Sequence, residues 1–504
     1  MDDNTLIITK KDEVFAKVTC ERCVAKELSE YFTFMVPGHQ FTPAFRNRVW
    51  DGKIRMFNLQ SNTIYLGLLG YIEEFAKERE YVIEYGDPRP DLADDYPLIQ
   101  GKSYVKRLHL QAHGDHVEMR DYQLNAFVHI MRYKRALLLS PTASGKSLII
   151  YTIVRMLLEE KGYKGLIIVP TTSLVEQLYS DFADYSGGNS FDVAENTHRI
   201  YQGKDKNTSK GITISTWQSL YTLPKEYFAQ FDYVIGDEAH LFKAQSLTHI
   251  MTSCTNAKYR IGLTGSLDNT KTHKLVLEGL FGPVERVAST RELMDKKQLA
   301  ELEIKCLILK HDDAECKMVK ELNDYQKEVE YLVTNDARNR FIKNLALSLG
   351  NNTLILYQFV DKHGQILYDN LLKSKNLGEK KVHFIHGGIE AEDREIIRKL
   401  MEESSENIIV ASFGTFSTGT NIRNLDNLIL ASPSKSRIRN LQSIGRALRT
   451  SSTKSKATLY DIADDMRVGK HMNFTLKHFV ERVKIYTEEK FAYKIYKIGL
   501  KNGK

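Results

Sequence analysis

The sequence has little cysteine and no long hydrophobic run. Five cysteines in 504 residues are few and odd in number, so we expect a reducing environment and no disulfide framework. A membrane-spanning helix needs about 20 consecutive apolar residues, and no stretch of the sequence approaches that length. The N-terminus (MDDNTLIITKKDE) is acidic and therefore unlike a secretory signal peptide. We expect a cytoplasmic protein without a membrane partner.

Positive and negative charges are nearly balanced, except at the C-terminal end. The chain carries 71 Lys and Arg against 64 Asp and Glu, a net charge of +7. Residues 466–504 contain 10 Lys and Arg and 3 Asp and Glu, so this end alone accounts for +7 and the rest is near neutral. A basic end suits a polyanionic partner, although a solvated charged face is the commoner explanation of such a run.

The chain is long enough for about three domains. Residues 1–98 predict a small α+β domain that ends in a linker rich in proline and aspartate. Apolar strands then alternate with helical stretches in 99–295 and again in 296–465, the pattern of two parallel α/β domains in tandem. We expect 466–504 to form a short, helical, basic extension. Strands of the α/β domains are predicted at 136–139, 166–169, 212–215, 233–236 and 261–263, and at 304–309, 353–357, 382–385, 408–411, 428–431 and 457–462.

The stretch ALLLSPTASGKS, residues 136–147, predicts a phosphate-binding loop between a buried strand and a helix. Backbone N–H groups of such a loop and the N-terminus of its helix surround an anion. Gly145 lets the backbone approach the phosphates, Lys146 can reach the β- and γ-phosphates, and Ser147 can ligate Mg²⁺. The general pattern has glycine where this chain has Ser140, so a chance Gly-Lys-Ser at a helix start is the alternative.

A second motif, FDYVIGDEAH at 231–240, places two adjacent carboxylates at the end of an apolar strand. Phosphoryl transfer needs one group for the metal and one for the nucleophile. Asp237 can hold the Mg²⁺ that Ser147 also contacts, and Glu238 can orient or deprotonate an attacking water. A DE pair on a surface is common, but one that ends a buried strand downstream of a phosphate loop is not.

Four motifs in this order resemble those of the superfamily 2 helicases: SGKS at 144–147, DEAH at 237–240, LTGS at 263–266 and QSIGRALR at 442–449. The joint pattern covers roughly residues 110–465 and is far more specific than any single motif. Within that superfamily the chain is similar to a phage helicase of recombination and repair, also in its N-terminal unit and tail. The resemblance implies two RecA-like domains, ATP and Mg²⁺ as cofactors and, for a phage gene, the host cytoplasm.

The same resemblance suggests further nucleotide contacts. Gln123 lies where the family reads adenine, because an amide can pair with adenine N6 and N7; an exposed capping glutamine is the alternative. Arg446 and Arg449 share one helix face and could complete the phosphate site from the second α/β domain, as an arginine finger does. An amphipathic helix whose arginines face solvent is the alternative there. The remaining candidates are Thr142, Ala143, Ser144 and Gln442.

Three segments resemble those by which the family holds nucleic acid: VPTTSLVEQ at 169–177, STWQS at 215–219 and GTFSTGTN at 414–421. Hydroxyl groups and helix N-termini suit phosphates without reading sequence. Each segment alone would more often be a plain strand end. In the family, residues such as Thr264 to Ser266 couple the nucleotide site to strand movement. The candidate contacts are Thr171, Thr172, Trp217, Gln218, Thr418 and Gly419.

The N-terminal unit contains FRNRVWDGKIRMF at 45–57, in which basic and aromatic residues alternate. Basic groups suit phosphates and aromatic rings suit stacked bases, so Arg46, Arg48, Trp50 and Lys53 are candidate contacts. A small sheet with an ordinary core tryptophan explains the pattern equally well.

Cys20 and Cys23 have the spacing of a zinc knuckle, for which His113 and His116 are the candidate further ligands. There is no second pair of cysteines at this spacing, and the two pairs lie in different predicted domains, so we do not expect zinc.

These observations and the resemblance predict an ATP-dependent DNA helicase or translocase of branched DNA: Holliday junctions, stalled forks and D-loops, with RNA–DNA hybrids as a further candidate substrate. No residue distinguishes DNA from RNA, so an RNA helicase and a duplex translocase without strand separation remain open. A binding protein with an inactive ATP site is disfavoured, because Lys146, Asp237, Glu238 and both arginines are present. We expect a monomer, with single-strand-binding or recombination proteins as possible partners.

Overall fold

The computed structural model describes residues 4–86, 89, 93–242, 245–267, 270–389, 396–397, 400, 404–417, 424–432, 443–445, 448 and 456–500. Within these ranges, no helix combines the length and apolar character that crossing a membrane requires. The chain forms two compact units, one of residues 1–140 with 144–287 and the other of residues 288–504 with 141–143. The division falls after Val287, where the sequence suggested a boundary after Asp295.

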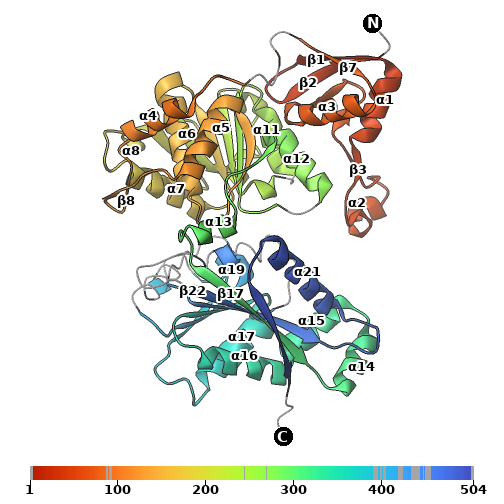
Figure 1. Ribbon diagram of the computed structural model, residues 1–504, viewed down its shortest axis with the longest axis vertical. Coiled ribbons are helices and arrows are strands. Elements are labelled where there is room, and N and C mark those ends of the chain that lie inside the picture. The colour runs from red at the N-terminus through yellow and green to blue at the C-terminus, as the bar shows by residue number, and fades with distance from the viewer. Residues whose placement is uncertain are drawn as a thin grey trace. The chain divides into compact units, whose positions relative to one another are not determined.

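The N-terminal part of the first unit is a five-stranded sheet of order β5-β6-β2-β1-β7 (Figure 1). One side chain in two is buried along its central strands, since Leu6 and Ile8 are fully buried on β1 and Ala16 and Val18 on β2. This is the pattern of a sheet with one covered face. The elements are β1 (Thr5–Lys10), β2 (Phe15–Thr19), α1 (Arg22–Tyr31), β5 (Phe57–Asn58), β6 (Thr63–Tyr65), α3 (Leu69–Glu78) and β7 (Val82–Tyr85).

A small lobe, residues 33–55, projects from this sheet (Figure 1). Its base is an antiparallel pair of strands, β3 (Thr33–Met35) and β4 (Lys53–Arg55). Between them lie a 3₁₀ turn, η1 (His39–Phe41), and a short helix, α2 (Pro43–Arg46), which begins at the N-cap Thr42. We call residues 33–55 the N-terminal lobe.

The N-terminal sheet packs directly on a helix of the following α/β domain, α12 (Lys271–Phe281). The contact is made by the 3₁₀ turn η2 (Leu66–Leu68), in which a Cβ at Gly67 would lie 1.9 Å from the carbonyl oxygen of Glu278. Only glycine permits so close an approach of two backbones. The Tyr71 hydroxyl donates to Glu278 Oε2 over 2.7 Å beside this contact.

The first α/β domain is a parallel sheet of order β12-β13-β11-β14-β15-β10-β16. Helices α5, α6 and α7 cover one face, and α11 and α12 cover the other (Figure 1). All five strands predicted here are present; β12 and β16, the two edge strands, were missed. The elements are α4 (Leu98–Arg107), β8 (Gln111–Ala112), β9 (Asp115–His116), α5 (Asp121–Tyr133), β10 (Arg135–Leu139), α6 (Lys146–Lys161), β11 (Gly165–Val169), α7 (Thr172–Tyr185), α8 (Val193–Asn196), β12 (Thr197–Ile200), β13 (Ile212–Thr216), α9 (Trp217–Leu220), α10 (Lys225–Phe228), β14 (Tyr233–Asp237), α11 (Gln245–Ser253), β15 (Tyr259–Thr264) and β16 (Val284–Arg286).

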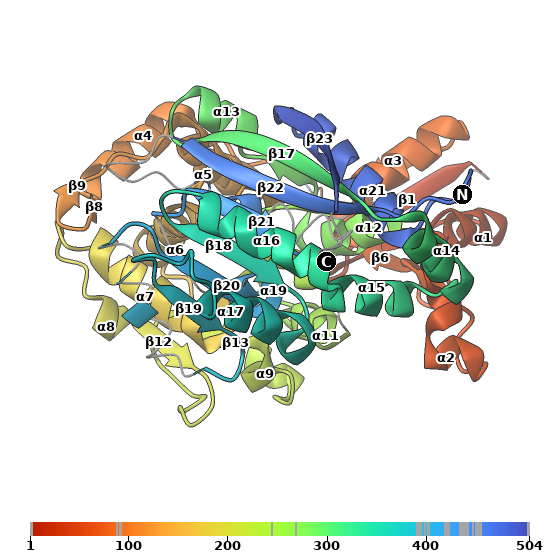
Figure 2. The same ribbon diagram turned by 90° about the horizontal axis from the view of Figure 1, so that it is seen from below.

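The second unit is built on another parallel sheet, of order β19-β20-β18-β21-β22-β17-β23. Helices α16 and α17 cover one face and α21 covers the other (Figures 1 and 2). All six predicted strands are present. The elements are α13 (Thr290–Asp295), β17 (Glu301–Lys310), α14 (Asp313–Leu322), α15 (Tyr325–Thr334), α16 (Asp336–Ser348), β18 (Thr353–Tyr357), α17 (Gln365–Leu372), β19 (Val382–Ile385), β20 (Ile408–Ser412), α19 (Phe413–Ser417), β21 (Asn427–Leu430), β22 (Lys456–Asp465), α21 (Phe474–Glu488) and β23 (Tyr493–Gly499).

The basic C-terminal segment contributes the expected helix, α21, and also a strand. This strand, β23, pairs in parallel with β17 from Ile304 opposite Tyr493 to Lys310 opposite Gly499. The helix is fixed to the sheet by a buried ion pair, in which Arg482 donates to Asp461 over 2.8 to 3.0 Å. The segment after residue 465 is therefore an integral part of the second sheet.

Candidate nucleotide site and nucleic-acid surfaces

The candidate motifs of the first unit all lie at one edge of its sheet, where the parallel strands end. We call this the carboxyl edge. Along it, Gln218 follows β13, Thr171 follows β11, the carboxylates end β14, Thr264 ends β15 and the phosphate loop follows β10. The candidate nucleic-acid segments and the phosphate loop thus lie on either side of the carboxylates, which is the edge at which open α/β sheets bind ligands.

The phosphate loop has the left-handed turn that its glycine allows. Gly145 has φ of 81° and is the N-cap of α6. Ser140, which stands where the general pattern has glycine, is fully buried, and its hydroxyl lies 2.6 Å from that of Ser144. The Ser140 N–H donates to the Thr264 carbonyl over 2.9 Å, which ties the start of the loop to β15. The serine therefore has a structural role that glycine could not supply. Of the other loop candidates, Ala143 also has positive φ, and Thr142 precedes it.

Gln123 contacts the phosphate loop. Its amide Nε2 donates to the Ser144 carbonyl over 2.8 Å, and its Oε1 accepts from the Arg120 N–H over 2.8 Å. The side chain is 3% exposed, so the alternative of an exposed capping glutamine is wrong, although the capping contact itself is present. One amide N–H and one lone pair remain for adenine. Its contact with adenine stays a prediction.

The two carboxylates and the lysine form the charged centre of the site. Lys146 Nζ lies 3.8 Å from Glu238 Oε1. Burial, and then the charge of Glu238, raise the pKa of Asp237 to about 6, while Lys146 and the Glu238 N–H act in the opposite direction. Two carboxylates facing one lysine leave a net negative charge. The Ser147 hydroxyl and the Asp237 carboxylate are hard oxygen ligands, so this donor set fits Mg²⁺.

His240, the last residue of DEAH, connects these carboxylates to β15. Its Nδ1 lies 3.1 Å from Thr264 Oγ1 and 3.4 Å from Glu238 Oε2. The His240 carbonyl in turn lies 3.0 Å from Nε2 of His273, a buried residue of α12. The motif at Thr264 and the DEAH turn are therefore one bonded assembly.

The two candidate nucleic-acid segments of the first unit lie side by side. Their strands are neighbours, with Val169 paired to Thr216, and Gln218 Nε2 lies 3.5 Å from the Pro170 carbonyl. Thr171 is the N-cap of α7, and its hydroxyl accepts from the Leu174 N–H over 3.3 Å. Among their candidate contacts, Thr172 and Gln218 are exposed, and Thr171 and Trp217 are half-buried.

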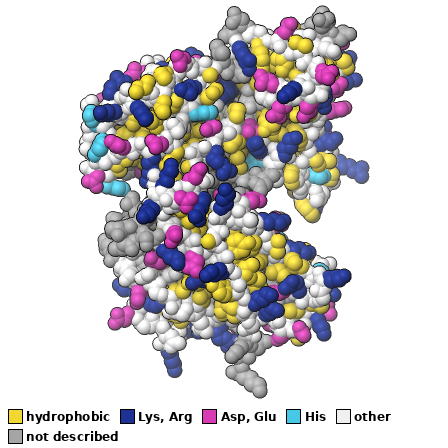
Figure 3. Space-filling view, viewed as in Figure 1, with side chains coloured by type: hydrophobic (Ala, Val, Ile, Leu, Met, Phe, Trp, Pro, Cys, Tyr) yellow, Lys and Arg dark blue, Asp and Glu magenta, His cyan; other side chains and the backbone are white. Residues whose placement is uncertain are grey.

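The basic candidates of the N-terminal domain are exposed on the N-terminal lobe. Arg46, Arg48 and Lys53 are exposed, and Trp50 is half-buried, with its Nε1–H donating to the Lys53 carbonyl over 2.9 Å. Phe41 and Val49 are 69% and 81% exposed beside them. Figure 3 shows cationic and hydrophobic side chains together on this lobe. Trp50 is therefore not part of the buried core.

The candidates of the second α/β domain, Thr418, Gly419, Gln442, Arg446 and Arg449, lie outside the described residues. The loop after β18 in the same domain is described. The Gln358 N–H donates to Ser432 Oγ over 3.0 Å, and Phe359 is 38% exposed. Residues Val360–Gly364 form a π-helical turn, a form that is frequent at functional sites.

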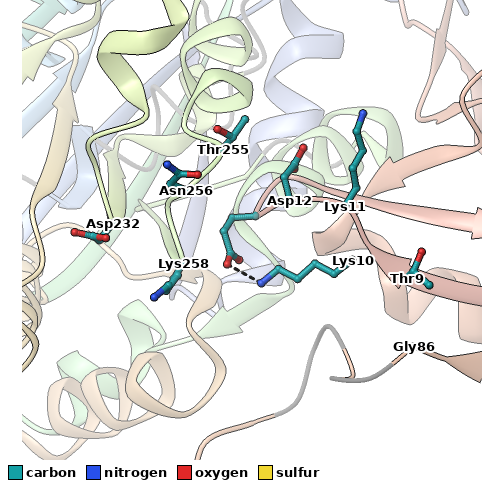
Figure 4. Close-up of a pocket in the computed structure, with 10 residues that line it drawn as sticks. Thr9, Lys10, Lys11, Asp12, Gly86, Asp232, Thr255, Asn256 and Lys258 are labelled. Atoms are coloured by element: carbon teal, nitrogen blue, oxygen red, sulfur yellow. Dashed lines mark hydrogen bonds and ion pairs between the residues drawn. The ribbon is translucent and has the colours of Figure 1, made fainter.

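A cavity of about 730 Å³ lies between the N-terminal sheet and the first α/β domain (Figure 4). Its lining charges already have partners: Lys10 pairs with Glu13 at 2.6 Å, and Lys258 Nζ donates to the Tyr163 hydroxyl over 3.4 Å. Asp12 accepts from the N–H groups of its own turn. The cavity is a polar seam between domains rather than a candidate catalytic site.

The cysteine and histidine pairs are not assembled into a metal site. Across the described ranges, no three His, Cys, Asp or Glu side chains form a group that could hold a metal ion. All five cysteines are free thiols, and burial is the main cause that raises the pKa of Cys20 to about 11.

Two residues that contact the site, Tyr185 and His273, lie outside every sequence motif. The Ser147 hydroxyl lies 2.8 Å from that of Tyr185, at the end of α7, and His273 holds the DEAH turn. In an amphipathic helix, the spacing of a tyrosine or histidine does not distinguish a residue that contacts the site from an ordinary core residue. The sequence therefore contains no signal for either contact.

Three family models match successive parts of the chain. They are described as DNA helicase UvsW, N-terminal, over residues 6–86; Type III restriction enzyme, res subunit, over residues 116–269; and Helicase conserved C-terminal domain, over residues 336–451. Together they cover the N-terminal sheet, the first α/β domain and much of the second.

Among curated relatives, the ATP-dependent DNA helicase uvsW of Enterobacteria phage T4 is 32% identical over 508 residues, 96% of this chain and 97% of the relative. The crystal structure of T4 UvsW matches with a TM-score of 0.53 at 30% identity, covering 99% of this chain and all of that chain (100%). The DNA 3'-5' translocase XPB2 of Sulfurisphaera tokodaii is 29% identical over 42% of this chain and 46% of its own length.

Two tandem RecA-like sheets, a phosphate loop and a DEAH motif at the carboxyl edge define an ATP-dependent helicase of superfamily 2. Within that class, identity over nearly the whole length places this chain in the UvsW family. The small N-terminal α+β domain, which has its own family model, agrees with that placement.

Proposed function

We propose that this chain uses ATP hydrolysis to unwind or branch-migrate branched DNA, including Holliday junctions, stalled forks and D-loops, and to remove RNA–DNA hybrids. The observation that supports it most strongly is the 32% identity to the T4 DNA helicase, which extends through the N-terminal domain and not only the motor domains. The exposed basic and aromatic side chains of the N-terminal lobe are of the kind that hold a nucleic-acid backbone and its bases.

In the proposed reaction, the loop N–H groups and Lys146 bind the phosphates of ATP, and Ser147 with Asp237 hold Mg²⁺. Bound Mg²⁺ would neutralise charge on the phosphate oxygens and orient them. Glu238, 3.8 Å from Lys146, positions the attacking water and accepts its proton. Arg446 and Arg449 complete the site from the second unit, and Gln442 assists them. Gln123 reads adenine while holding Ser144.

The proposed nucleic-acid contacts follow the same division of labour. Thr171, Thr172, Trp217 and Gln218 hold the backbone at the carboxyl edge of the first sheet, and Thr418 and Gly419 do so in the second unit. Alternate grip by the two units, timed by ATP, would move the strand. We infer that the working form is a monomer in the cytoplasm, joined by single-strand-binding or recombination proteins.

The decisive experiment measures ATP hydrolysis and strand separation on matched substrates. The panel contains forks, four-way junctions, R-loops and plain duplexes, each in an all-DNA version and, where possible, with RNA in one strand. We expect branched DNA to stimulate hydrolysis most and to be unwound, and RNA duplexes to be poor substrates. A preference for RNA duplexes would contradict the proposal.

Lys146→Ala tests the nucleotide site in the same assays. This change should abolish ATP turnover and leave DNA binding intact, because the lysine lies on the phosphate loop and not on a candidate DNA contact. Glu238→Gln should also stop turnover while still binding ATP, since it keeps the loop and the metal ligands. Retained turnover in Lys146→Ala would refute the site assignment.

A second candidate is a translocase that moves on duplex DNA without separating its strands. It is favoured by the similarity to the Sulfurisphaera tokodaii translocase, although that similarity covers 42% of this chain. Displacement of the third strand of a triplex, with no strand separation of an ordinary duplex, would identify this activity.

A further inference from the structure

Tyr185 contacts the candidate Mg²⁺ ligand, although it lies outside every motif. The tyrosine is the last residue of α7, and its hydroxyl lies 2.8 Å from Ser147 Oγ, on the first turn of α6. The two residues are 38 positions apart in the chain. Neither the phosphate-loop pattern nor the helical spacing of α7 requires this contact.

The tyrosine ring is held in place from its sides. It packs against Tyr151 of α6 with ring centroids 5.5 Å apart, and it borders the main hydrophobic core of the domain. With the ring fixed, its hydroxyl can reach only a narrow region.

A serine hydroxyl has one hydrogen and two lone pairs, and it rotates among three staggered positions. The bond to Tyr185 selects one of these positions. When Ser147 donates its hydrogen to Tyr185, both lone pairs of its oxygen are left for a metal ion. This is how a partner behind a metal ligand fixes the orientation of that ligand.

We propose that Tyr185 is a positioning residue, which holds the Ser147 hydroxyl in the orientation that binds Mg²⁺ together with the nucleotide. The inference rests on the proposed role of Ser147 as a metal ligand. It adds a residue from α7, the helix whose first turn carries the candidate nucleic-acid contacts Thr171 and Thr172, so that one helix links both sites.

The test is Tyr185→Phe, which removes one oxygen and keeps the ring. The matched control is Tyr151→Phe, because Tyr151 is a neighbouring tyrosine whose hydroxyl bonds to Ser186 Oγ over 2.6 Å and accepts from Arg155 over 2.5 Å, and among the described residues it makes no hydrogen bond to Ser147. Binding of a fluorescent ADP analogue is measured in EDTA and along a Mg²⁺ titration. Nucleotide binding is read without turnover, so the result does not depend on catalysis.

We expect Tyr185→Phe to raise the Mg²⁺ concentration for half-maximal tightening of ADP binding by about tenfold, the loss typical of removing a partner behind a metal ligand. Affinity in EDTA should stay unchanged, and Tyr151→Phe should behave like the natural protein in both conditions. An unchanged Mg²⁺ requirement in Tyr185→Phe, or an equal loss of affinity in EDTA, would overturn the inference.

Ser147→Ala separates this inference from the proposed function. If Ser147→Ala raises the Mg²⁺ requirement and Tyr185→Phe adds nothing in that background, Tyr185 acts through Ser147. A further tenfold rise in the double variant would show that Tyr185 acts elsewhere, which overturns the inference alone. If Ser147→Ala does not change the Mg²⁺ requirement, Ser147 is not a metal ligand, and the inference about Tyr185 is wrong as well.

Discussion

The imidazole of His240 donates a hydrogen bond to Thr264. The distance from His240 Nδ1 to Thr264 Oγ1 is 3.1 Å, and the Thr264 hydroxyl lies 2.9 Å from the Ser266 carbonyl. A carbonyl can only accept, so the single hydroxyl hydrogen of Thr264 points to Ser266, and His240 must supply the other hydrogen. The protonated Nδ1 also lies 3.4 Å from Glu238 Oε2. His240 therefore connects the Glu238 carboxylate to the end of β15.

Thr264→Val tests whether this bond couples hydrolysis to strand movement. Valine keeps the shape and removes the hydroxyl, so His240 loses its acceptor while the phosphate loop and the carboxylates stay in place. We expect DNA-stimulated ATP turnover to persist and the rate of strand separation to fall about tenfold, within the range of reported coupling energies. Both rates are measured on the same fork substrate.

Thr213→Val is the matched control for that change. Thr213 is a fully buried threonine of the same sheet, and its Oγ1 has no hydrogen-bond partner among the described residues. It should leave both rates unchanged. An equal fall in ATP turnover and strand separation in Thr264→Val would mean that Thr264 supports catalysis rather than coupling.

Gly67→Ala should detach the N-terminal sheet from α12. The added methyl would lie 1.9 Å from the Glu278 carbonyl oxygen, where the facing group is backbone and cannot turn aside. Overpacking of this kind costs about 1–3 kcal/mol. Thermal unfolding of the first unit should therefore begin at a lower temperature, and proteolysis between the N-terminal sheet and α4 should become faster.

Gly70→Ala provides the comparison, because nothing lies within 4 Å of a Cβ at that position in α3. Alanine favours a helix over glycine, so this variant should be as stable as the natural protein or more stable. If both variants destabilise the first unit to the same degree, the close approach at Gly67 does not hold the two parts together.

The central strands and the phosphate loop could be predicted from the sequence, because buried parallel strands are continuous apolar runs bounded by turns. Three of the four edge strands of the two α/β sheets, β12, β16 and β23, could not, whereas β19 at the fourth edge could. Thr197–Ile200 (THRI) and Tyr493–Gly499 (YKIYKIG) contain lysine, arginine or histidine, and neither is a continuous apolar run. Their strand form depends on pairing with a neighbour, which is a property of the sheet and not of the segment.

The candidate site shows the same limit. The sequence motifs predicted Lys146, Asp237 and Glu238, because a motif consists of the residue types that a reaction needs. Contacts between motifs depend on tertiary packing, which is why the bonds from Gln123 to Ser144 and from Ser147 to Tyr185 could not be foreseen. In the N-terminal lobe, sequence could not decide between a core tryptophan and an exposed aromatic group, because both give the same spacing.

Arg46 and Arg48 should contribute to DNA binding through phosphate charge alone. Replacing both with Gln on the exposed lobe should weaken DNA binding and lower the slope of log affinity against log salt concentration by about 1 per lost phosphate contact. ATP turnover without DNA should not change. Fluorescence anisotropy on a labelled fork, at several salt concentrations, measures the slope.

Arg55→Gln is the comparison for these two arginines. Arg55 already forms an ion pair with Asp51 on the same lobe, so its charge is locally compensated. This variant should change the salt slope less than either Arg46→Gln or Arg48→Gln. Equal slopes for all three variants would mean that net charge, and not the positions of Arg46 and Arg48, governs binding.

His363 should make the second unit sensitive to acid. The side chain is fully buried beside Arg338 and Asp464, and its Nδ1 lies 3.0 Å from Ser432 Oγ. Burial, and then the charge of Arg338, lower its pKa from 6.5 to about 3. The unfolded chain therefore binds a proton below pH 6.5 that the folded chain does not bind until about pH 3.

Because the unfolded state takes up more protons in this range, the free energy of unfolding falls as the pH falls below 6.5, by about 1.4 kcal/mol per pH unit from this residue alone. His363→Asn removes the titration, so the melting temperature of the second unit should depend less on pH between 6.5 and about 5 than in the natural protein. Ser432→Ala keeps the imidazole and removes the hydroxyl that contacts both His363 Nδ1 and the Gln358 N–H, so it should lower stability yet retain the steep pH dependence. Parallel curves for His363→Asn and the natural protein would show that other groups cause the acid sensitivity, since only the difference between the two slopes reports on His363.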